Sequence, residues 1–483
     1  MMTLMLALGA LTGCSAQDEE PEATRDVKVD RVDPEQAVES EFPRACVSSG
    51  RTYVTWQDAR DGVTAVYVNA TVDGGASWMA GDVRLNAGTA PARAPAIACA
   101  GDDVWVVWED ERDGALANRN IRLNRSTDGG RSWLEEDVAL DGDPEGDAMS
   151  LGPRVAAADG DVYVSWFDSR NGAYDVFVQA SSDGGASWLD TATRVESDAA
   201  GEGYSAWAEL AVDKDGRVVV AWEDSRNGAS DVYVARSTDG GLSFDEDVRL
   251  DGGSDGTNSF LPRLAMAGDA VHVVWHDERN GDARDVYVAS SQDGGATWPD
   301  EPTRLDADGA GQNDSLNPDL VAFGDRVHVV WQDDRGGGYD VYYRASFDGG
   351  GSFGDELRLD TDVPGEAQSY DASIAAVGNG VVVTWEDRRA DADEGFNDLY
   401  YNWSGDGGKT FQDADLRINS NAPASSWAIE SSVHVDVANE RIVTVWADGR
   451  FGSGDVFYAS RAFGEDSVYV PPEEDDEAEA KAW

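Results

Sequence analysis

One stretch of the chain, WEDSRNGASDVYVARSTDGGLSF at residues 222–244, recurs closely enough to decide the fold. Related stretches are WFDSRNGAYDVFVQASSDGGASW at residues 166–188 and WHDERNGDARDVYVASSQDGGATW at residues 275–298. The opening tryptophan marks eight units, spaced 52 to 61 residues apart, at Trp56, Trp108, Trp166, Trp222, Trp275, Trp331, Trp385 and Trp446. A period of about 50 residues is typical of the blades of a β-propeller.

Each unit carries four segments with the β-branched and aromatic residues that strands favour. In the fifth unit they are PRLAMA, AVHVVWHD, DVYVASS and TRLDAD, and turn residues separate them. The sequence therefore predicts an all-β protein, a single eight-bladed β-propeller of four-stranded blades over residues 26–463. Its 41% apolar residues and 17 Trp suffice for a core of this size.

The eighth unit lacks a fourth strand after DVFYASRAF. The segment DVKVD at residues 26–30 is similar to the fourth-strand segments DVRLN at 82–86 and DVRLD at 247–251, so an N-terminal strand can complete the last blade. SVYV at residues 467–470 is the alternative, and we favour the N-terminal strand because it repeats the pattern of the unit. Residues 464–483 form an acidic tail that we expect to be disordered.

Residues 1–14 begin with an apolar run and end in Leu11-Thr12-Gly13-Cys14. This pattern is similar to a bacterial lipoprotein signal, in which Cys14 receives the lipid, and residues 15–25 would form an acidic linker. An ordinary cleaved signal peptide is the alternative. We therefore expect a protein of the cell envelope, lipid-anchored at the outer membrane or cell surface, or a secreted one.

The net charge of −57 comes with only four Lys against 33 Arg. Such a charge repels nucleic acid and anionic membrane surfaces, so we expect neither as a partner except through the lipid anchor. We expect a monomer.

Two cysteines, Cys46 and Cys99, remain after the signal. An exported protein can hold a disulfide, but spacing alone does not show that the two Cα atoms approach closely enough. We favour two separate buried thiols over a bridge.

The segment that follows the third strand has the pattern S/T-x-D-G-G-x-S/T-W/F in seven units. We call these the Asp-box segments: residues 71–78, 126–133, 181–188, 237–244, 291–298, 346–353 and 404–411. The chain resembles the sialidase-like propellers with Asp-box, or bacterial neuraminidase, repeats. The resemblance implies a turn on the face opposite the ligand site, and an Asp carboxylate can cap such a turn. We therefore predict structural roles for Asp73, Asp128, Asp183, Asp239, Asp293, Asp348 and Asp406.

The W-x-D-x-R element, such as Trp222-Glu-Asp224-Ser-Arg226, also repeats in the units. Catalysis needs one asymmetric set of groups, so we assign this element to the hairpin between the second and third strands. DKDGR at 213–217 and DADGAGQND at 306–314 contain many oxygen ligands, but neither completes an EF-hand loop. We predict no metal and no cofactor.

A ligand site is expected on the top face, where the fourth-to-first connections are long and differ from one another. They supply aromatic side chains suited to a sugar ring or a peptide, or to filling gaps between blades: Tyr204, Trp207, Phe260, Tyr370 and Trp427.

Arginines are the second candidate set. Arg44, Arg154 and Arg263 each follow a Pro that lies 13 residues before the blade Trp. Sialidases carry a Y/F-R-I-P motif and three Arg that bind the sialate carboxylate, and Arg93-Ala-Pro-Ala-Ile97 is similar to that motif in part. No catalytic residue is assigned. We predict a glycan- or protein-binding module, and the alternative is an exo-sialidase-like glycoside hydrolase.

Overall fold

The computed structural model describes residues 26–32, 38–112, 118–142, 148–252, 256–281, 283–390, 396–423 and 425–462. Cys14, the linker at 15–25, and residues 464–483 lie outside these ranges, so the lipoprotein, linker and tail predictions stay predictions. The described residues contain eight four-stranded antiparallel sheets and no helix. No segment of the described chain forms a helix able to span a membrane.

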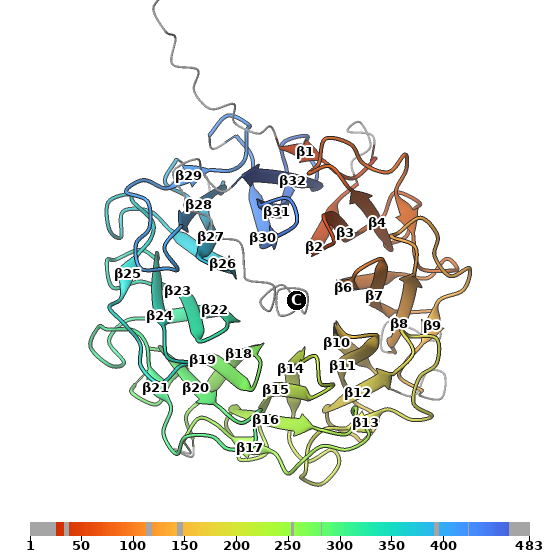
Figure 1. The fold of residues 1–483 in the computed structure, drawn as a ribbon, viewed down its shortest axis with the longest axis horizontal. Coiled ribbons are helices and arrows are strands. Elements are labelled where there is room, and N and C mark those ends of the chain that lie inside the picture. The colour runs from red at the N-terminus through yellow and green to blue at the C-terminus, as the bar shows by residue number, and fades with distance from the viewer. Residues whose placement is uncertain are drawn as a thin grey trace, which may run out of the picture.

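The eight sheets surround a central axis as the blades of one ring (Figure 1), which confirms the predicted eight-bladed propeller. The inner strands are β2 (Ser40–Ser48), β6 (Ala92–Ala100), β10 (Ser150–Ala158), β14 (Ser205–Val212), β18 (Ser259–Ala267), β22 (Ser315–Phe323), β26 (Ser369–Val377) and β30 (Ala428–Asp436). The second strands are β3 (Arg51–Asp58), β7 (Asp103–Asp110), β11 (Asp161–Asp168), β15 (Val218–Asp224), β19 (Ala270–Asp277), β23 (Arg326–Asp333), β27 (Gly380–Asp387) and β31 (Arg441–Asp448). We number the blades 1 to 8 in this order.

The third strands are β4 (Ala65–Thr71), β8 (Asn120–Ser126), β12 (Asp175–Ser181), β16 (Asp231–Ser237), β20 (Asp285–Ser291), β24 (Asp340–Ser346), β28 (Asp398–Ser404) and β32 (Asp455–Ala462). The outer strands are short: β5 (Val83–Arg84), β9 (Val138–Ala139), β13 (Thr193–Arg194), β17 (Val248–Arg249), β21 (Thr303–Arg304), β25 (Leu357–Arg358), β29 (Leu416–Arg417) and, in blade 8, β1 (Val27–Lys28).

The N-terminal strand closes the ring, as predicted. In β1, Val27 pairs with Tyr458 and Lys28 with Phe457 of β32. The backbone N–H of Val456 also donates to Asp30 Oδ2 (2.6 Å). The first and last strands of the propeller therefore cover each other's edge.

The core lies between neighbouring blades. Second strands such as β15 are buried on both faces, because a blade packs against one neighbour on each side. Trp222 of blade 4, which is fully buried, belongs to one apolar cluster with Tyr163 and Val178 of blade 3. The tryptophan of one blade thus packs against the neighbouring blade.

The top face carries the hairpins between second and third strands. In blade 4, Asp224 accepts hydrogen bonds from Trp222 Nε1 (3.1 Å) and Arg226 Nη2 (2.5 Å). The Arg226 guanidinium also contacts Asp247 (3.0 Å) and lies 4.1 Å from the ring centroid of Tyr233. The same Asp–Arg ion pair occurs in all eight blades, at Asp58–Arg60, Asp110–Arg112, Asp168–Arg170, Asp224–Arg226, Asp277–Arg279, Asp333–Arg335, Asp387–Arg389 and Asp448–Arg450.

Two groups of three aspartates each surround an arginine side chain. Asp285, Asp306 and Asp308 converge on Nη2 of Arg304, and Asp340, Asp360 and Asp362 do the same around Arg358. A guanidinium therefore supplies the positive charge at both carboxylate groups. In the loop at 213–217, Asp213 Oδ1 accepts the backbone N–H groups of Asp215 (3.0 Å) and Arg217 (2.9 Å), which is turn geometry.

The Asp-box segments lie on the opposite, bottom face. Asp239 Oδ1 accepts the backbone N–H of Ser243 (3.0 Å), and Oδ2 accepts its hydroxyl (2.6 Å). Ser237 donates to Asp239 (2.7 Å) and accepts the N–H of Gly241 (2.9 Å). The same backbone hydrogen bond is made by Asp73, Asp128, Asp183, Asp239, Asp293, Asp348 and Asp406.

Cys46 and Cys99 form a disulfide, so the prediction of two separate thiols was wrong. The two residues lie on the inner strands β2 and β6 of adjacent blades, with their Cα atoms 6.0 Å apart. Their positions along the two inner strands differ by one residue, which turns the side chains to opposite sheet faces, and the facing sides of adjacent blades are such opposite faces.

Candidate ligand site at the top of the channel

Each inner strand is interrupted near its top by a β-bulge, where one residue adopts a left-handed backbone. In β14, the register shifts between Ala206 and Glu209, and Trp207 has φ of 55°. The left-handed position of the eight bulges is occupied by Phe42, Ala94, Gly152, Trp207, Leu261, Asn317, Asp371 and Glu430. A bulge turns the strand locally and redirects the side chains that follow.

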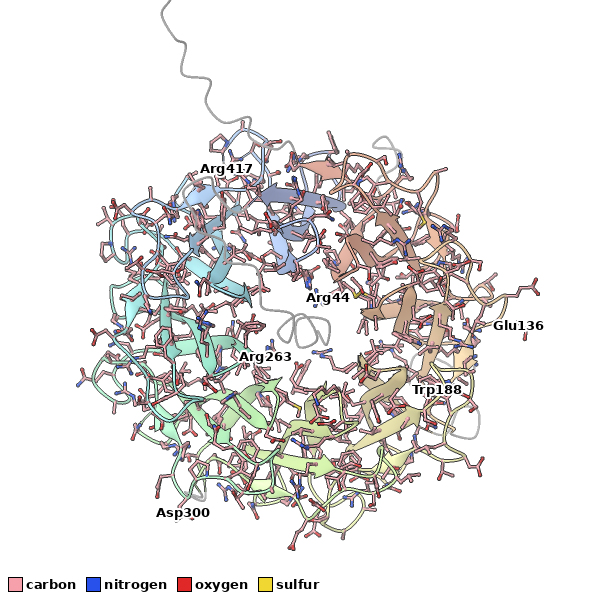
Figure 2. All side chains as sticks on the ribbon, viewed as in Figure 1. Arg44, Glu136, Trp188, Arg263, Asp300 and Arg417 are labelled. Atoms are coloured by element: carbon pink, nitrogen blue, oxygen red, sulfur yellow. A yellow bond between two sulfur atoms is a disulfide. The ribbon has the colours of Figure 1, made fainter. Side chains whose placement is uncertain are left out.

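The first paired residue after each bulge forms a ring around the upper channel. Figure 2 shows Arg44 and Arg263 projecting towards the axis. We call the eight positions the channel ring: Arg44, Ala96, Arg154, Glu209, Arg263, Asp319, Ser373 and Ser432. Three of the four arginines singled out in the sequence are therefore brought together.

The fourth arginine, Arg93, lies apart from this ring. It precedes the bulge of β6, where the ring position is Ala96. Its Nε donates to Glu111 Oε1 (3.3 Å). The resemblance of the Arg93 segment to a sialidase motif therefore does not place it with the other three.

Sequence reasoning missed two acidic members of the ring, Glu209 and Asp319. Glu209 Oε1 accepts hydrogen bonds from Arg154 (3.3 Å) and Arg263 (3.0 Å). Burial tends to raise the pKa of Glu209, but these two guanidinium groups outweigh burial and lower it. Burial raises the pKa of Asp319, which accepts the backbone N–H groups of Leu320 (3.0 Å) and Ile374 (3.1 Å).

Arg44 differs from its two counterparts. Its Nη1 donates to the carbonyl of Pro43 (2.9 Å), and it makes no ion pair with any described residue. Enclosure in the channel lowers the pKa of Arg44, and repulsion from Arg154 and Arg263 adds to the shift, while Glu430 opposes it. Among the described residues, Arg44 is thus the one ring guanidinium without an ion pair.

A hydrogen bond between blades repeats around the top face. The residue between Trp and Asp in one hairpin accepts the backbone N–H of the left-handed residue in the next blade. Donor and acceptor pairs are Ala94–Gln57, Gly152–Glu109, Leu261–Glu223, Asn317–His276, Asp371–Gln332 and Glu430–Glu386. Two of the eight junctions differ. Between blades 8 and 1 the acceptor position is Ala447, and the N–H of Phe42 donates instead to Glu430 Oε2 (2.7 Å). Between blades 3 and 4 the acceptor position is Phe167, and an aromatic contact takes the place of the hydrogen bond.

This exception is part of an aromatic cluster, which we call the shelf: Phe167, Tyr174, Tyr204 and Trp207. The rings of Phe167 and Trp207 lie 6.1 Å apart, and Tyr174 contacts both Phe167 (5.4 Å) and Tyr204 (5.2 Å) edge to face. Trp207 is 52% exposed and Tyr204 is 49% exposed, whereas Phe167 is buried. The shelf offers two exposed rings on a packed base.

The other three predicted aromatic residues are held by their surroundings. Phe260 contacts the ring of His276 (5.7 Å), and the Tyr370 hydroxyl donates to Asn397 Oδ1 (2.8 Å). The Trp427 indole lies so close to Gly449 that a Cβ there would be 2.5 Å from its Nε1. These side chains fill the top of the blades and leave Tyr204 and Trp207 as the exposed pair among the five.

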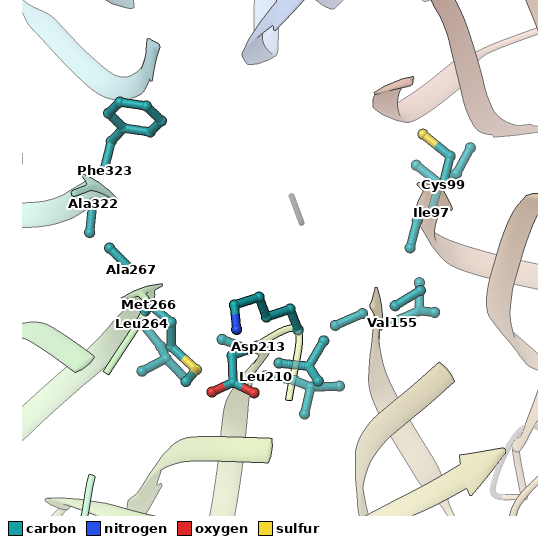
Figure 3. Close-up of a pocket in the computed structure, with 17 residues that line it drawn as sticks. Ile97, Cys99, Val155, Leu210, Asp213, Leu264, Met266, Ala267, Ala322 and Phe323 are labelled. Carbon is teal, nitrogen blue, oxygen red and sulfur yellow. The ribbon is translucent and has the colours of Figure 1, made fainter. Parts of the chain in front are cut away.

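Below the ring, the channel wall is mainly apolar. Figure 3 shows one hollow of about 200 Å³ between blades 2 to 6, where Ile97, Val155, Leu210, Leu264 and Met266 line the wall. A second hollow of about 350 Å³ lies against blades 1, 6, 7 and 8. The channel is therefore charged above and mainly apolar below, with Asp213 and Lys214 in one hollow and His434 in the other.

Similarity to known proteins is confined to the fold. No protein-family model and no curated protein matches the chain. Among solved structures, an ulvan lyase of polysaccharide lyase family PL25 shares 12% identity at a TM-score of 0.50, covering 91% of this chain and 96% of the lyase. The polysaccharide lyase Uly1 shares 13% identity (TM-score 0.49; coverage 80% and 94%), and the Hadza microbial sialidase Hz136 shares 14% (TM-score 0.39; coverage 74% and 76%). The likeness to the PL25 lyase shows a similar fold and nothing more.

Proposed function

We propose that the protein is a glycan-binding module whose ligand lies on the shelf at blades 3 and 4. The observation that carries this proposal is the pair of exposed rings of Trp207 and Tyr204 at the one place where an aromatic contact replaces the hydrogen bond between blades. An aromatic face in water offers apolar contact to the C–H face of a sugar, while hydroxyl groups of the sugar stay solvated.

Charged groups next to the shelf favour an anionic sugar. Glu209 lies two residues after Trp207 on β14, and it binds Arg154, whose side chain is 40% exposed. An arginine that is oriented by a carboxylate presents its remaining N–H donors in a fixed fork, which suits a carboxylate or sulfate substituent. The rest of the acidic protein surface repels such a ligand, so Arg154 would be its point of entry.

The proposal is tested on a glycan array with the unmodified chain, followed by affinity measurements on the best ligand. Trp207→Ala should weaken binding by about tenfold, the order expected for one aromatic contact, with little change in melting temperature. Trp427→Ala is the matched control, because that indole is packed against Gly449; it should lower the melting temperature and leave the affinity of the folded protein unchanged. Equal affinity of wild type and Trp207→Ala would refute the shelf as the site.

An exo-sialidase-like glycoside hydrolase is the second candidate. It is favoured by one observation: the pKa of Glu209 is lowered and that of Asp319 is raised, within the same channel ring. Most glycoside hydrolases, apart from the sialidases with their tyrosine nucleophile, use two carboxyl groups whose surroundings set their pKa values apart. Turnover of a fluorogenic sialoside that disappears in both Glu209→Gln and Asp319→Asn would establish the enzyme, and no turnover by the wild type would leave the binding module.

We also propose that the protein is anchored by a lipid on Cys14, on the strength of the Leu11–Cys14 sequence. Metabolic labelling with a palmitate analogue tests this. Labelling of the wild type but not of Cys14→Ser is expected, and an unlabelled wild type would indicate a secreted protein.

A further inference from the structure

The channel wall beneath Arg44 combines a polar upper edge with an apolar surface. The hollow of about 350 Å³ is bordered above by Asp319, Ser373 and Ser432 of the channel ring. Below them it is lined mainly by apolar side chains, among them Val47, Ala376 and Val435, and by His434, whose Nε2 lies 3.3 Å from the Ser432 hydroxyl. From Arg44 to the end of β2 the strand descends roughly 13 Å at about 3.3 Å per residue.

The charge at this edge is not balanced within the ring. Three guanidinium groups face the channel, and Glu209 contacts two of them, Arg154 and Arg263. Asp319 already accepts two backbone N–H groups, and Glu430 accepts the N–H of Phe42 (2.7 Å). Within the described part of the chain, Arg44 donates only to the neutral carbonyl of Pro43, with the Glu430 carboxylate as an attracting charge nearby.

We propose that this wall binds an anionic single-chain amphiphile, of which a fatty acid is the simplest form. The carboxylate would lie on Arg44 beside the Ser432 hydroxyl, and the hydrocarbon chain would run down over Val47, Ala376 and Val435, which are partly exposed. A small inorganic anion would leave the apolar wall exposed to water, and a neutral hydrocarbon would leave the guanidinium unpaired, so neither matches both parts of the site.

The site is separate from the shelf. Arg44 and Ser432 belong to blades 1 and 8, whereas Trp207 belongs to blade 4. The inference therefore does not rest on the proposed glycan function, and either can fail alone. Variants of Arg44 should bind glycan normally, and Trp207→Ala should bind the amphiphile normally.

The experiment is calorimetric titration of the full chain with octanoate, decanoate and dodecanoate below their micelle concentrations, with dodecanol as the uncharged control. Affinity should rise about threefold to fourfold for each added methylene that the wall covers. Dodecanol should bind at least tenfold more weakly than dodecanoate. Arg44→Gln should remove this difference, because it removes the charge that selects the carboxylate.

Arg263→Gln is the matched control for Arg44, since Arg263 is held by Glu209; it should change dodecanoate affinity less than threefold. Ala376→Asp places a charge on the wall and should abolish binding, with the melting temperature checking that the variant folds. Equal binding of dodecanoate and dodecanol by the wild type overturns the proposal. So does an Arg44→Gln variant that keeps the wild-type difference in affinity between the two. No binding to the full chain also overturns it.

Discussion

The top hairpins and the channel ring are built from the same residue types, yet they differ in regularity. At the hairpins, the same Asp–Arg ion pair forms in all eight blades. In the ring, equivalent positions hold three Arg, two acids, two Ser and one Ala. Arginine is therefore a structural residue in one region and a candidate ligand group in the other.

The difference shows how function can be located in a repeat protein. Packing between blades imposes the same demands eight times, so residues that satisfy it recur. A ligand touches the ring once and from one side, so its site is expected where the repeat is broken. Both sites inferred above follow this logic: the shelf replaces a repeated hydrogen bond, and Arg44 lacks the carboxylate that its counterparts have.

The largest effect is expected at the disulfide. It occurs once, as a ligand site would, and it lies in the wall of the channel, yet we assign it a structural role. Opening it in the Cys46→Ser/Cys99→Ser variant should cost about 4 kcal/mol of unfolding free energy, the chain-entropy value for residues separated by 53 positions. Denaturant unfolding of oxidised wild type and variant measures this. If glycan affinity fell while the unfolding free energy stayed unchanged, the disulfide would be part of the ligand site and not a structural feature.

A hairpin carboxylate should come next in size. Asp224 is fully buried and accepts from Trp222, Arg226 and the Ser205 hydroxyl (3.0 Å). Asp224→Ala leaves these donors without their acceptor and should cost about 3 kcal/mol. Asp277→Ala in the next blade should cost the same, as determined by denaturant unfolding. Unequal losses, or an effect of either variant on ligand affinity, would contradict the structural assignment of the repeat.

Much of the fold could be predicted from the sequence because its determinants are local and recur. The blade tryptophans gave the number of blades, and the likeness of DVKVD to DVRLD identified the closing strand that pairs Val27 with Tyr458. The disulfide could not be predicted in this way. Whether Cys46 and Cys99 meet depends on how far the inner strands converge, and that distance is a property of the whole ring.

The candidate site was predictable only in part. Arg44, Arg154 and Arg263 were found because each follows a Pro at a fixed distance from the blade Trp, and Asp319 follows Pro318 at that same distance. Glu209 has no such mark, since Ala208 takes the place of the proline. Exposure of the aromatic residues also could not be inferred: Trp207 and Trp427 both lie in long top-face connections, but only the structure shows that Gly449 covers one of them.

The smallest effect is expected on the bottom face, at an Asp-box segment. Burial tends to raise the pKa of Asp239, but hydrogen bonds from Ser243 and Ser237 outweigh it and hold that pKa below its usual value. The carboxylate is largely exposed, so Asp239→Ala should cost only about 1 kcal/mol of unfolding free energy, as for a capping residue.

Because the pKa of Asp239 is lowered in the folded protein, this contribution is present above the ordinary pKa of an aspartate and is lost as the pH falls through the folded value. The wild type and the variant should therefore converge in unfolding free energy in acid and differ at neutral pH. Glycan affinity at neutral pH should be the same in the wild type and the variant, because the segment lies on the face opposite the shelf. Loss of binding by a folded Asp239→Ala protein would place the ligand on the bottom face, at a repeated segment, and would contradict the assignment of the ligand site to unrepeated residues.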